Sequence, residues 1–408
     1  VAIPSDTGTA QDRLVPDVTA LSGVSELDGI TICKYRIISN SFDTCTAVAH
    51  FEEDQSPGGL PTHLIIRLEK SRDCNPLLAT AALQRLAHRR LPHLVPKVWG
   101  AGHTQTENGT KLSYMLTQFY MDTCTLESVW NDMDSCSRQA LVEQVVPLFF
   151  HLADVSLANF AEETNILRGT PFERPKTEGP VMVGGPAYGY FRDFSSFLMA
   201  AMSPGNARYS IDQKPDGAVA IQMKSPQDIG FGFAQTDLDL LSHMSVLCHN
   251  DLEPRNILVR KVVTGDDKTA YQPVSVIGWK SAGFFPFAFE VGHKDTCLGL
   301  QNQSWSWYSL YRRCAGRILS ETAPAARPIW SRLIRAMVFT DIARKETNEL
   351  NVENLVQQLW HEREQTNAFV DAGTGYAKGA GTVGVESFSA ADNEDLELVA
   401  LRKLRYID

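Results

Sequence analysis

A polar segment between apolar runs constrains this chain more than any other feature of its sequence. The run Val246-Leu-Cys leads into His249, Asp251 and Asn256, and the apolar run Ile257-Leu-Val follows directly. After a polar stretch, residues 274–286 are again largely apolar. Short apolar runs bounded by turn residues are typical of buried strands. The order therefore predicts a loop that strands hold on both sides and that carries His249, Asp251 and Asn256.

The spacing within this loop, H-x-D-x-x-x-x-N, is typical of the catalytic loop of kinases. In that chemistry the Asp accepts the proton of the acceptor hydroxyl, and the Asn amide oxygen helps to hold a metal ion. Asp251 is therefore a candidate catalytic residue, and Asn256 is a candidate cofactor ligand. A lone H-x-D would be weak evidence, but the full pattern between apolar strands is fairly specific.

Residues 249–259 and 279–290 together resemble the aminoglycoside phosphotransferase (APH) and choline kinase-like family, most closely its fungal members. The resemblance covers roughly residues 30–365. It implies an α+β, two-lobed, protein kinase-like fold of the APH type, with a small antiparallel-sheet N-lobe and a larger, mainly helical C-lobe. It also places Arg67 where the family has its nucleotide-contacting cation, and it makes Ser113–Phe119 the hinge between the lobes. Many of the fungal members are associated with secondary metabolism.

The same comparison divides the chain into parts. We expect an N-terminal arm at 1–29, the N-lobe and hinge at 30–120, the C-lobe at 121–372, and a Gly-rich linker with a C-terminal helix at 373–408. Within the C-lobe the catalytic-type loop is 246–260 and the metal-type loop is 274–286. Hydrophobic periodicity predicts helices over 76–90, 137–160, 190–202, 236–244, 303–320, 327–346, 353–370 and 393–406, and strands over 30–38, 46–52, 63–69, 95–99 and 114–120.

The metal-type loop departs from the family pattern. Relatives have Ile-Asp-Trp-Glu, whereas this chain has Ile277-Gly278-Trp279-Lys280. The missing Asp is the main magnesium ligand, and magnesium depends on carboxylates and substrate phosphates, so Asn256 alone is a poor site. We therefore predict no protein metal ligand here. In an extended segment residues 278 and 280 point the same way, so we expect the Lys280 ammonium to approach the vacated position.

Other parts of the kinase pattern are weakened as well. Thr80 stands where a Glu should pair with the cation of the strand, and Glu253 replaces a His that is common in relatives. The presumed phosphate-covering loop, 39–44, contains no glycine, so its backbone is less free to wrap phosphates.

Three functional hypotheses follow from this pattern. The first is a metal-independent acid–base enzyme that acts on a natural-product intermediate as a cyclase, isomerase, dehydratase or condensing enzyme, with Asp251, Lys280, Glu253 and His249 as catalytic candidates and no cofactor. The second is a surviving small-molecule O-phosphotransferase that uses ATP and magnesium through Arg67 and Asn256. The third is a non-catalytic pseudokinase that only binds. Phe284, Phe285, Trp305 and Trp307 suggest an apolar or aromatic ligand, although such residues are more often part of a core.

The composition of the chain argues against several classes of binding partner. The net charge of −10 and the absence of a basic stripe argue against nucleic-acid binding. No apolar run is long enough to span a membrane, and the first residues lack the features of a signal peptide, so we expect a cytoplasmic protein. The eight cysteines are scattered without the spacing of a zinc site. The sequence specifies no oligomeric state.

Overall fold

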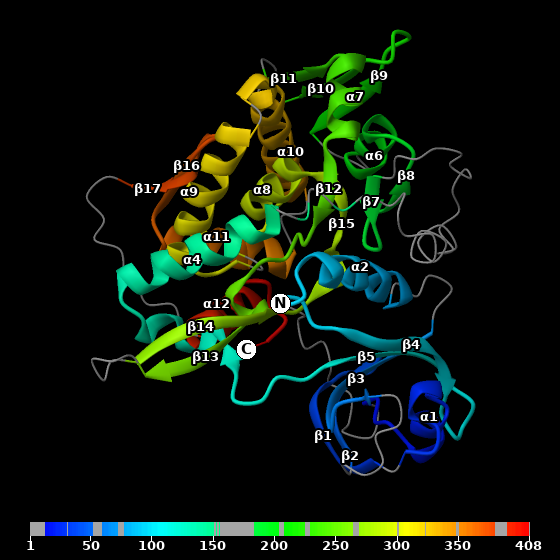
Figure 1. Cartoon of the computed structure of the whole chain (residues 1–408). Helices are drawn as coiled ribbons and strands as arrows, with labels where there is room; N and C mark the ends of the chain where they lie inside the picture. Colours follow the sequence, from blue (N-terminus) through cyan, green and yellow to red (C-terminus); the bar gives the residue numbers. More distant parts are fainter. Residues whose placement is uncertain are drawn as a thin grey trace.

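The computed structural model of the chain describes residues 13–30, 32–51, 59–71, 77–150, 152, 155, 183–203, 208–224, 229–263, 269–299, 302–322, 324–347, 351–379 and 390–407. These residues form a smaller lobe built on one antiparallel sheet and a larger lobe of helices and short sheets (Figure 1). The α+β, two-lobed prediction is therefore confirmed.

The smaller lobe is a five-stranded antiparallel sheet in the order β1-β2-β3-β5-β4. Its strands are β1 (Ile32–Asn40), β2 (Thr44–Phe51), β3 (His63–Lys70), β4 (Val98–Gln105) and β5 (Lys111–Gln118), and one long helix, α2 (Leu77–Arg90), follows β3. Alternating residues of β2, β3 and β5 are buried together, including Leu64, Ile66 and Leu68. The period-2 pattern that predicted these strands thus marks the face of the sheet that forms a core.

The described part of the N-terminal arm packs on this lobe. Helix α1 (Val18–Ser22) begins at Asp17, whose carboxylate accepts a hydrogen bond from the Ala20 N–H at 2.7 Å, and a 3-10 turn (Ser25–Leu27) follows. Ala20, Val24 and Leu27 are buried in the same core as β3 and β5. The arm predicted at 1–29 is thus part of the smaller lobe from residue 13 onward, and residues 1–12 lie outside the described ranges.

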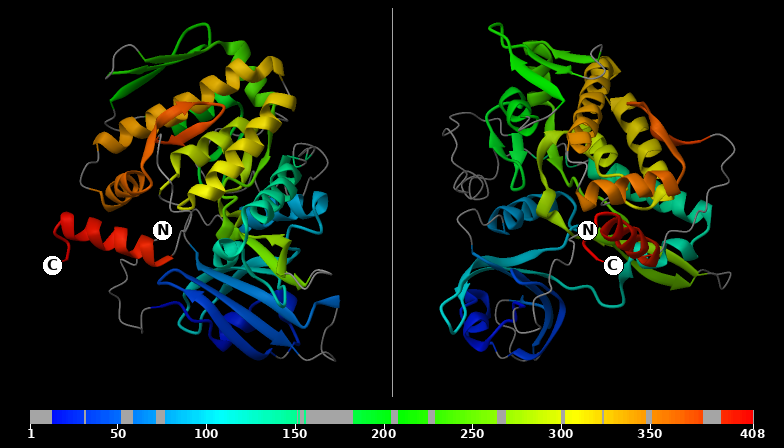
Figure 2. Two further views of the ribbon diagram at one scale, coloured as in Figure 1. Left: turned by 90° about the vertical axis from the view of Figure 1, so that its left-hand side faces the viewer. Right: turned by 180° about the vertical axis from the view of Figure 1, so that it is seen from behind.

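The larger lobe combines helices with short strands, of which the sequence patterns predicted those that flank the two loops, β12 to β15. Its helices are α3 (Leu126–Val129), α4 (Ser135–Phe150), α6 (Phe194–Ala201), α7 (Gln235–His243), α8 (Phe287–Thr296), α9 (Trp305–Thr322), α10 (Arg327–Thr347), α11 (Val352–Arg363) and α12 (Ala390–Lys403), with 3-10 turns at Trp130–Asp132 and Pro324–Ala326. Its strands are β6 (Cys124–Thr125), β7 (Val183–Gly185), β8 (Gly189–Phe191), β9 (Tyr209–Gln213), β10 (Val219–Met223), β11 (Gly230–Phe233), β12 (Ser245–Cys248), β13 (Ile257–Val263), β14 (Thr269–Val276), β15 (Gly283–Pro286), β16 (Thr366–Asp371) and β17 (Gly375–Lys378). The β9–β11 sheet lies at the end of this lobe that is remote from the smaller lobe (Figure 2).

Two predictions near the C-terminus are wrong. The helix predicted over 353–370 ends at Arg363, and residues 366–371 form strand β16 instead. The predicted Gly-rich linker begins with strand β17, which pairs with β16 as a hairpin, while residues 380–389 lie outside the described ranges. The helix predicted over 137–160 is described only to Phe150.

A buried polar cluster anchors this hairpin, which explains why its glycines do not form a linker. The Tyr308 hydroxyl accepts a hydrogen bond from the Tyr376 N–H at 2.8 Å and donates one to Asp295 at 2.7 Å. Arg312 donates to the Ala372 carbonyl at 2.9 Å and pairs with Asp295. Gly375 has φ +73°, and a Cβ there would overlap the Tyr308 hydroxyl. Only glycine allows the backbone to approach this cluster so closely.

We therefore expect Gly375→Ala to lower the free energy of unfolding by about 2–4 kcal/mol, because it combines a strained backbone with a steric overlap. Gly29→Ala is the matched control, since Gly29 has φ +74° with no atom within 4 Å of the added Cβ. Chemical denaturation of both variants measures the difference. Equal destabilisation of the two variants would contradict the anchoring role of Gly375.

Candidate functional site

Two pairs of strands hold the two predicted loops against each other. Strand β12 leads into loop 249–253 and a 3-10 turn, η8 (Pro254–Asn256), and pairs with β15, which follows the second loop. Strand β13 leaves η8 and pairs with β14, which enters the second loop. The Ile277 N–H donates to the Asn256 carbonyl at 2.8 Å. The catalytic-type loop and the metal-type loop are thus in contact, as their flanking apolar runs predicted.

The His249 side chain connects the backbones of the two loops. This side chain is buried, with Nε2 2.9 Å from the Ile277 carbonyl oxygen. Its Nδ1 accepts a hydrogen bond from the Asp251 N–H at 3.2 Å. Nε2 therefore carries the proton and donates, while Nδ1 accepts. Burial lowers the pKa of His249 to about 4, which keeps the imidazole neutral. Because backbone groups occupy both nitrogens, His249 positions Asp251 rather than exchanging protons with a substrate.

Two further buried residues fix the start of the loop. Asn250 has a left-handed backbone with φ +58°, and its side-chain amide donates to the Ser281 carbonyl at 3.0 Å. The Glu290 carboxylate on α8 accepts the His249 N–H at 3.2 Å, and burial raises the pKa of Glu290. No sequence motif predicts a role for either residue. An isolated carboxylate within the apolar run 284–291 was the only signal for Glu290.

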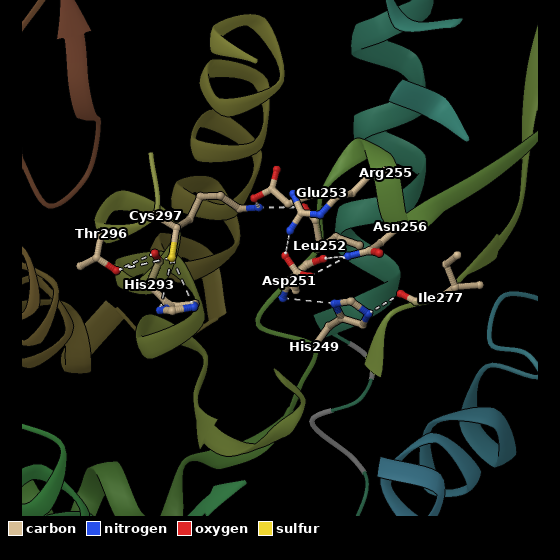
Figure 3. A network of polar contacts seen from close by, with 11 residues as sticks. His249, Asp251, Leu252, Glu253, Arg255, Asn256, Ile277, His293, Thr296 and Cys297 are labelled. Carbon is tan, nitrogen blue, oxygen red and sulfur yellow. Dashed lines mark hydrogen bonds and ion pairs between the residues drawn. The ribbon is translucent and has the colours of Figure 1, made fainter. Parts of the chain in front are cut away.

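Asp251 is the candidate acid–base of the loop that keeps contact with solvent, with 20% of its side chain exposed, whereas His249 and Glu253 are buried. One carboxylate oxygen, Oδ1, pairs with the Arg255 guanidinium. The other, Oδ2, accepts a hydrogen bond from the Asn256 amide at 2.8 Å, and the same amide donates to the Asp251 carbonyl at 2.8 Å. Figure 3 shows Arg255 and Asn256 reaching the carboxylate from the same stretch of chain. The sequence spacing of Asp251 and Asn256 therefore corresponds to a direct contact.

Glu253 lies behind the loop and is sealed from solvent. Its carboxylate pairs with Lys294 of α8, and each of these side chains is only 4% exposed. Lys294 also donates to the Leu252 carbonyl at 2.8 Å, so the pair ties the loop to the helix (Figure 3). Burial raises the pKa of Glu253 to about 7, although the charge of Lys294 opposes that rise. This position makes Glu253 a support of the loop, in contrast to the catalytic role considered from the sequence.

The expectation for Lys280 is wrong in its geometry. Gly278 has φ +83° and ψ +39°, and Trp279–Ser281 forms a 3-10 turn, so the segment is not extended and residues 278 and 280 do not share a direction. Lys280 is exposed. Asp251 pairs with Arg255 and Glu253 pairs with Lys294, and neither carboxylate forms a salt bridge with Lys280 in the part of the chain that the structure describes. Exposure also removes the burial that a Schiff-base lysine would need.

Gly278 is packed so closely that a side chain at this position would overlap its neighbour. A Cβ at this position would lie 2.5 Å from Oδ1 and 2.6 Å from Cγ of Asn256. The left-handed backbone is itself unfavourable for any residue with a Cβ. A residue with a side chain at 278 would therefore need both a change of backbone conformation and a shift of the Asn256 side chain.

Arg67, the candidate nucleotide contact, has a carboxylate partner that the sequence analysis did not identify. Its guanidinium donates to Glu69 Oε1 at 2.9 and 2.6 Å, two residues along the same strand. Thr80, which was compared with the usual carboxylate partner of such a cation, is buried. In the predicted phosphate-covering loop, the Ser41 hydroxyl accepts the N–H groups of Asp43 and Thr44 at 3.3 and 3.2 Å. This loop is thus a short hairpin turn held by its own side chains.

The aromatic residues that suggested an apolar ligand are mostly core. Phe284, Phe285 and Trp307 are buried, whereas Trp305 is half-buried. In the described ranges there is no group of three or more His, Cys, Asp or Glu side chains that could hold a metal ion. Helices that are both long and apolar enough to cross a membrane are likewise absent from those ranges.

No protein-family model matches the chain, and no curated protein matches it. Solved structures with a similar fold include the GDP complex of wild-type aminoglycoside 2′-phosphotransferase-IIIa, with 12% identity, 95% of this chain and 97% of that chain covered, and a TM-score of 0.38. Spectinomycin phosphotransferase, APH(9)-Ia, in complex with ADP and spectinomycin, has 12% identity over 85% of this chain and 98% of that chain, with a TM-score of 0.33. Since these scores lie below 0.5, the site is interpreted from its own residues.

The packing of Gly278 can be tested by substitution. We expect Gly278→Ala to lower the free energy of unfolding by roughly 2–4 kcal/mol, measured by denaturant titration. Gly109→Ala has nearly the same φ, +81°, with nothing near its Cβ, and Gly232→Ala has neither a positive φ nor a close neighbour. The expected order of destabilisation is Gly278, then Gly109, then Gly232.

A double variant separates the overlap from the backbone strain. Adding Asn256→Ala to Gly278→Ala removes the atoms that the new Cβ would meet, so the two changes together should destabilise less than the sum of the single changes. Strict additivity would contradict the contact.

The buried groups also predict how stability depends on pH. Between pH 4.5 and about 7 the folded chain keeps the proton of Glu253 that the unfolded chain releases, so this group contributes stability that is lost as pH rises through about 7. His249 acts in the opposite direction, because its pKa falls from 6.5 to about 4 on folding and its contribution is lost on acidification. We expect Glu253→Gln to gain roughly 3 kcal/mol of unfolding free energy relative to the native chain as pH rises from about 4.5 to 7. Exposed Glu127→Gln is the control, and a difference that does not vary with pH would contradict the assignment.

Proposed function

We propose that this chain is a small-molecule enzyme in which Asp251 acts as a general acid–base, without a nucleotide and without bound magnesium. One observation supports this above the others. Asn256 packs so tightly on Gly278 that the loop has no place for the carboxylate on which a magnesium site depends, yet Asp251 beside it remains oriented and partly exposed. A kinase needs both groups, whereas proton transfer needs only the second.

The contacts of Asp251 suit proton transfer. Arg255 and Asn256 hold one carboxylate oxygen each, and the His249 ring fixes the backbone N–H of Asp251. Holding a catalytic group in one orientation removes part of the entropic barrier to reaction. A carboxylate held in this way can take a proton from one carbon or oxygen of a substrate and return it to another. Cyclisation, isomerisation, dehydration and condensation all need this step.

Lys280 is proposed to support the same reaction from the neighbouring turn. Ser281, the next residue, accepts a hydrogen bond from Asn250, which precedes Asp251 in the other loop. An exposed ammonium on that turn can bind an anionic group of the substrate or stabilise negative charge that develops on a carbonyl oxygen. Its role is binding or electrostatic stabilisation, which does not require a depressed pKa or a Schiff base.

The substrate class is proposed from the resemblance of the sequence. Fungal relatives associated with secondary metabolism suggest an apolar or aromatic natural-product intermediate in the cytoplasm, with no nucleic-acid partner and no cofactor.

The runner-up is a phosphotransferase that uses ATP and magnesium. Its support is the spacing and direct contact of Asp251 and Asn256, together with Arg67 on β3. A pseudokinase that only binds a ligand is the remaining alternative.

Turnover of the physiological substrate separates these functions. A metabolite extract from cells that lack the gene is incubated with the purified chain, and the products are followed by mass spectrometry. We expect the native chain to consume one compound without added ATP and to form an isomer, a dehydrated product or a condensation product. Asp251→Asn keeps the shape of the side chain but removes its basicity, so it should lower kcat by about 10²–10⁴-fold.

Exposed Asp212→Asn on β9 is the matched control and should leave the rate unchanged. Consumption that requires added Mg-ATP and adds the mass of a phosphoryl group would establish the phosphotransferase instead. Binding of a compound without any turnover would favour the pseudokinase, and unchanged turnover in Asp251→Asn would exclude Asp251 as the acid–base.

A further inference from the structure

The C-terminal end of α8 carries an imidazole, and its C-cap residue Cys297 carries a thiol; the Asp251 site uses neither. His293 and Cys297 are four residues apart, so they lie on the same face of the helix. Cys297 Sγ lies 3.5 Å from Nε2 and 3.8 Å from Nδ1 of His293. Both side chains are half-buried, so neither is sealed inside the core. Figure 3 shows this pair beside the loop that carries Asp251.

Neighbouring aromatic rings hold the imidazole in place. The Tyr188 hydroxyl lies 3.5 Å from His293 Nδ1, on the nitrogen that is farther from the sulfur. The His293 ring is parallel to that of Phe289 at 6.1 Å, and Phe289 stacks on Phe285 at 4.5 Å. Nε2 is therefore the nitrogen placed to take the thiol proton. A nucleophile beside a base that a third group orients is the general arrangement for covalent catalysis.

The surrounding charges favour transfer of that proton. Burial raises the pKa of the Cys297 thiol, and so does the charge of Asp341 on α10. His293 and the Thr296 hydroxyl lower this pKa, and their effect is larger, so the pKa lies below its ordinary value. Burial lowers the pKa of His293, and so does the charge of Lys294. Cys297 and Asp251 raise this pKa, and their effect is larger, so the pKa lies above its ordinary value. The described cysteines in the cores behave differently, since burial raises the pKa of Cys45, Cys248 and Cys314.

We propose that Cys297 and His293 form a nucleophilic pair that adds covalently to conjugated carbonyl compounds. The Sγ proton passes to His293 Nε2, and Sγ then forms a bond to the β-carbon of the carbon–carbon double bond. The π electrons of that bond move to the carbonyl oxygen as an enolate, whose α-carbon takes the proton back from His293. Atoms and electrons balance without an oxidant, a leaving group or a second reactant.

The surroundings of the pair select this class of electrophile. Thiolate sulfur is polarisable and reacts readily with the soft β-carbon of a conjugated system. The half-buried ring of Tyr188 offers a planar apolar surface next to the pair, and the buried rings of Phe285 and Phe289 support it edge to face at 5.7 Å in each case. Such a surface stacks well against a flat conjugated ligand. The inference does not depend on the role proposed for Asp251.

Competitive labelling with N-ethylmaleimide, a conjugated carbonyl compound, tests the pair directly. The folded chain is treated with less reagent than total thiol at about pH 6.5, below the ordinary thiol pKa of about 8.5, and each cysteine is quantified by peptide mass spectrometry. Cys136 is the internal control because it is exposed, whereas Cys297 is only half-buried. We expect Cys297 to react about tenfold faster than Cys136. A rate equal to or below that of Cys136 would overturn the proposal.

Substitution of the imidazole identifies its contribution. His293→Gln should lower the labelling rate of Cys297 about tenfold and make it rise with pH as for an ordinary thiol, while Cys136 keeps its rate. If that variant does not fold, the pH profile of the native chain decides the question. In this profile Cys297 should react at pH values well below those at which Cys136 begins to react. Coincident pH profiles of the two cysteines would refute the pair. Labelling of Cys297 with unchanged turnover in Asp251→Asn would disprove the proposed function alone.

Discussion

The contact between the Asn256 side chain and the Gly278 backbone is the constraint on which the site depends. A glycine in the left-handed region lets residue 277 come close enough to donate its N–H to the Asn256 carbonyl and to accept the His249 ring N–H with its own carbonyl. Any side chain at 278 would have to occupy the space of the Asn256 amide. The contact that joins the two loops therefore leaves no space for a side chain at 278 unless the Asn256 amide shifts.

Behind this contact, buried polar groups hold the catalytic-type loop rigidly. Glu290 accepts the His249 N–H, and Lys294 joins Glu253 to the Leu252 carbonyl. Buried charges that lose a partner are strongly destabilising, so such pairs restrict the loop to one arrangement. These buried contacts leave only some of the polar residues of the loop accessible to a substrate. His249 and Glu253 are occupied with structure, whereas Asp251 and Arg255 keep 20% and 33% of their side chains exposed.

The sequence predicted the parts of this site that depend on local spacing. The contact of Asp251 with Asn256 follows from five residues of separation across a tight turn, and the strands on both sides follow from their apolar runs. The direction of Lys280 could not be predicted, because the period-2 rule fails where Gly278 turns the backbone left-handed. Glu290, Lys294 and the His293–Cys297 pair contact or approach the loop only through the packing of α8, and no short-range pattern encodes that packing. The linker predicted from residue 373 onward is wrong for a related reason. A glycine that permits close approach to Tyr308 and Arg312, such as Gly375, cannot be told from a linker glycine by sequence alone.

The central proposal is that the chain does not assemble a magnesium–nucleotide site. Calorimetric titration of the purified chain with ATP, in the presence and in the absence of magnesium, tests this claim most directly. The account predicts that magnesium does not increase the affinity for ATP, because the loop offers the ion no carboxylate at 278 and the carboxylate of Asp251 is engaged by Arg255 and Asn256. Saturable binding of ATP that tightens about tenfold or more when magnesium is added would contradict it.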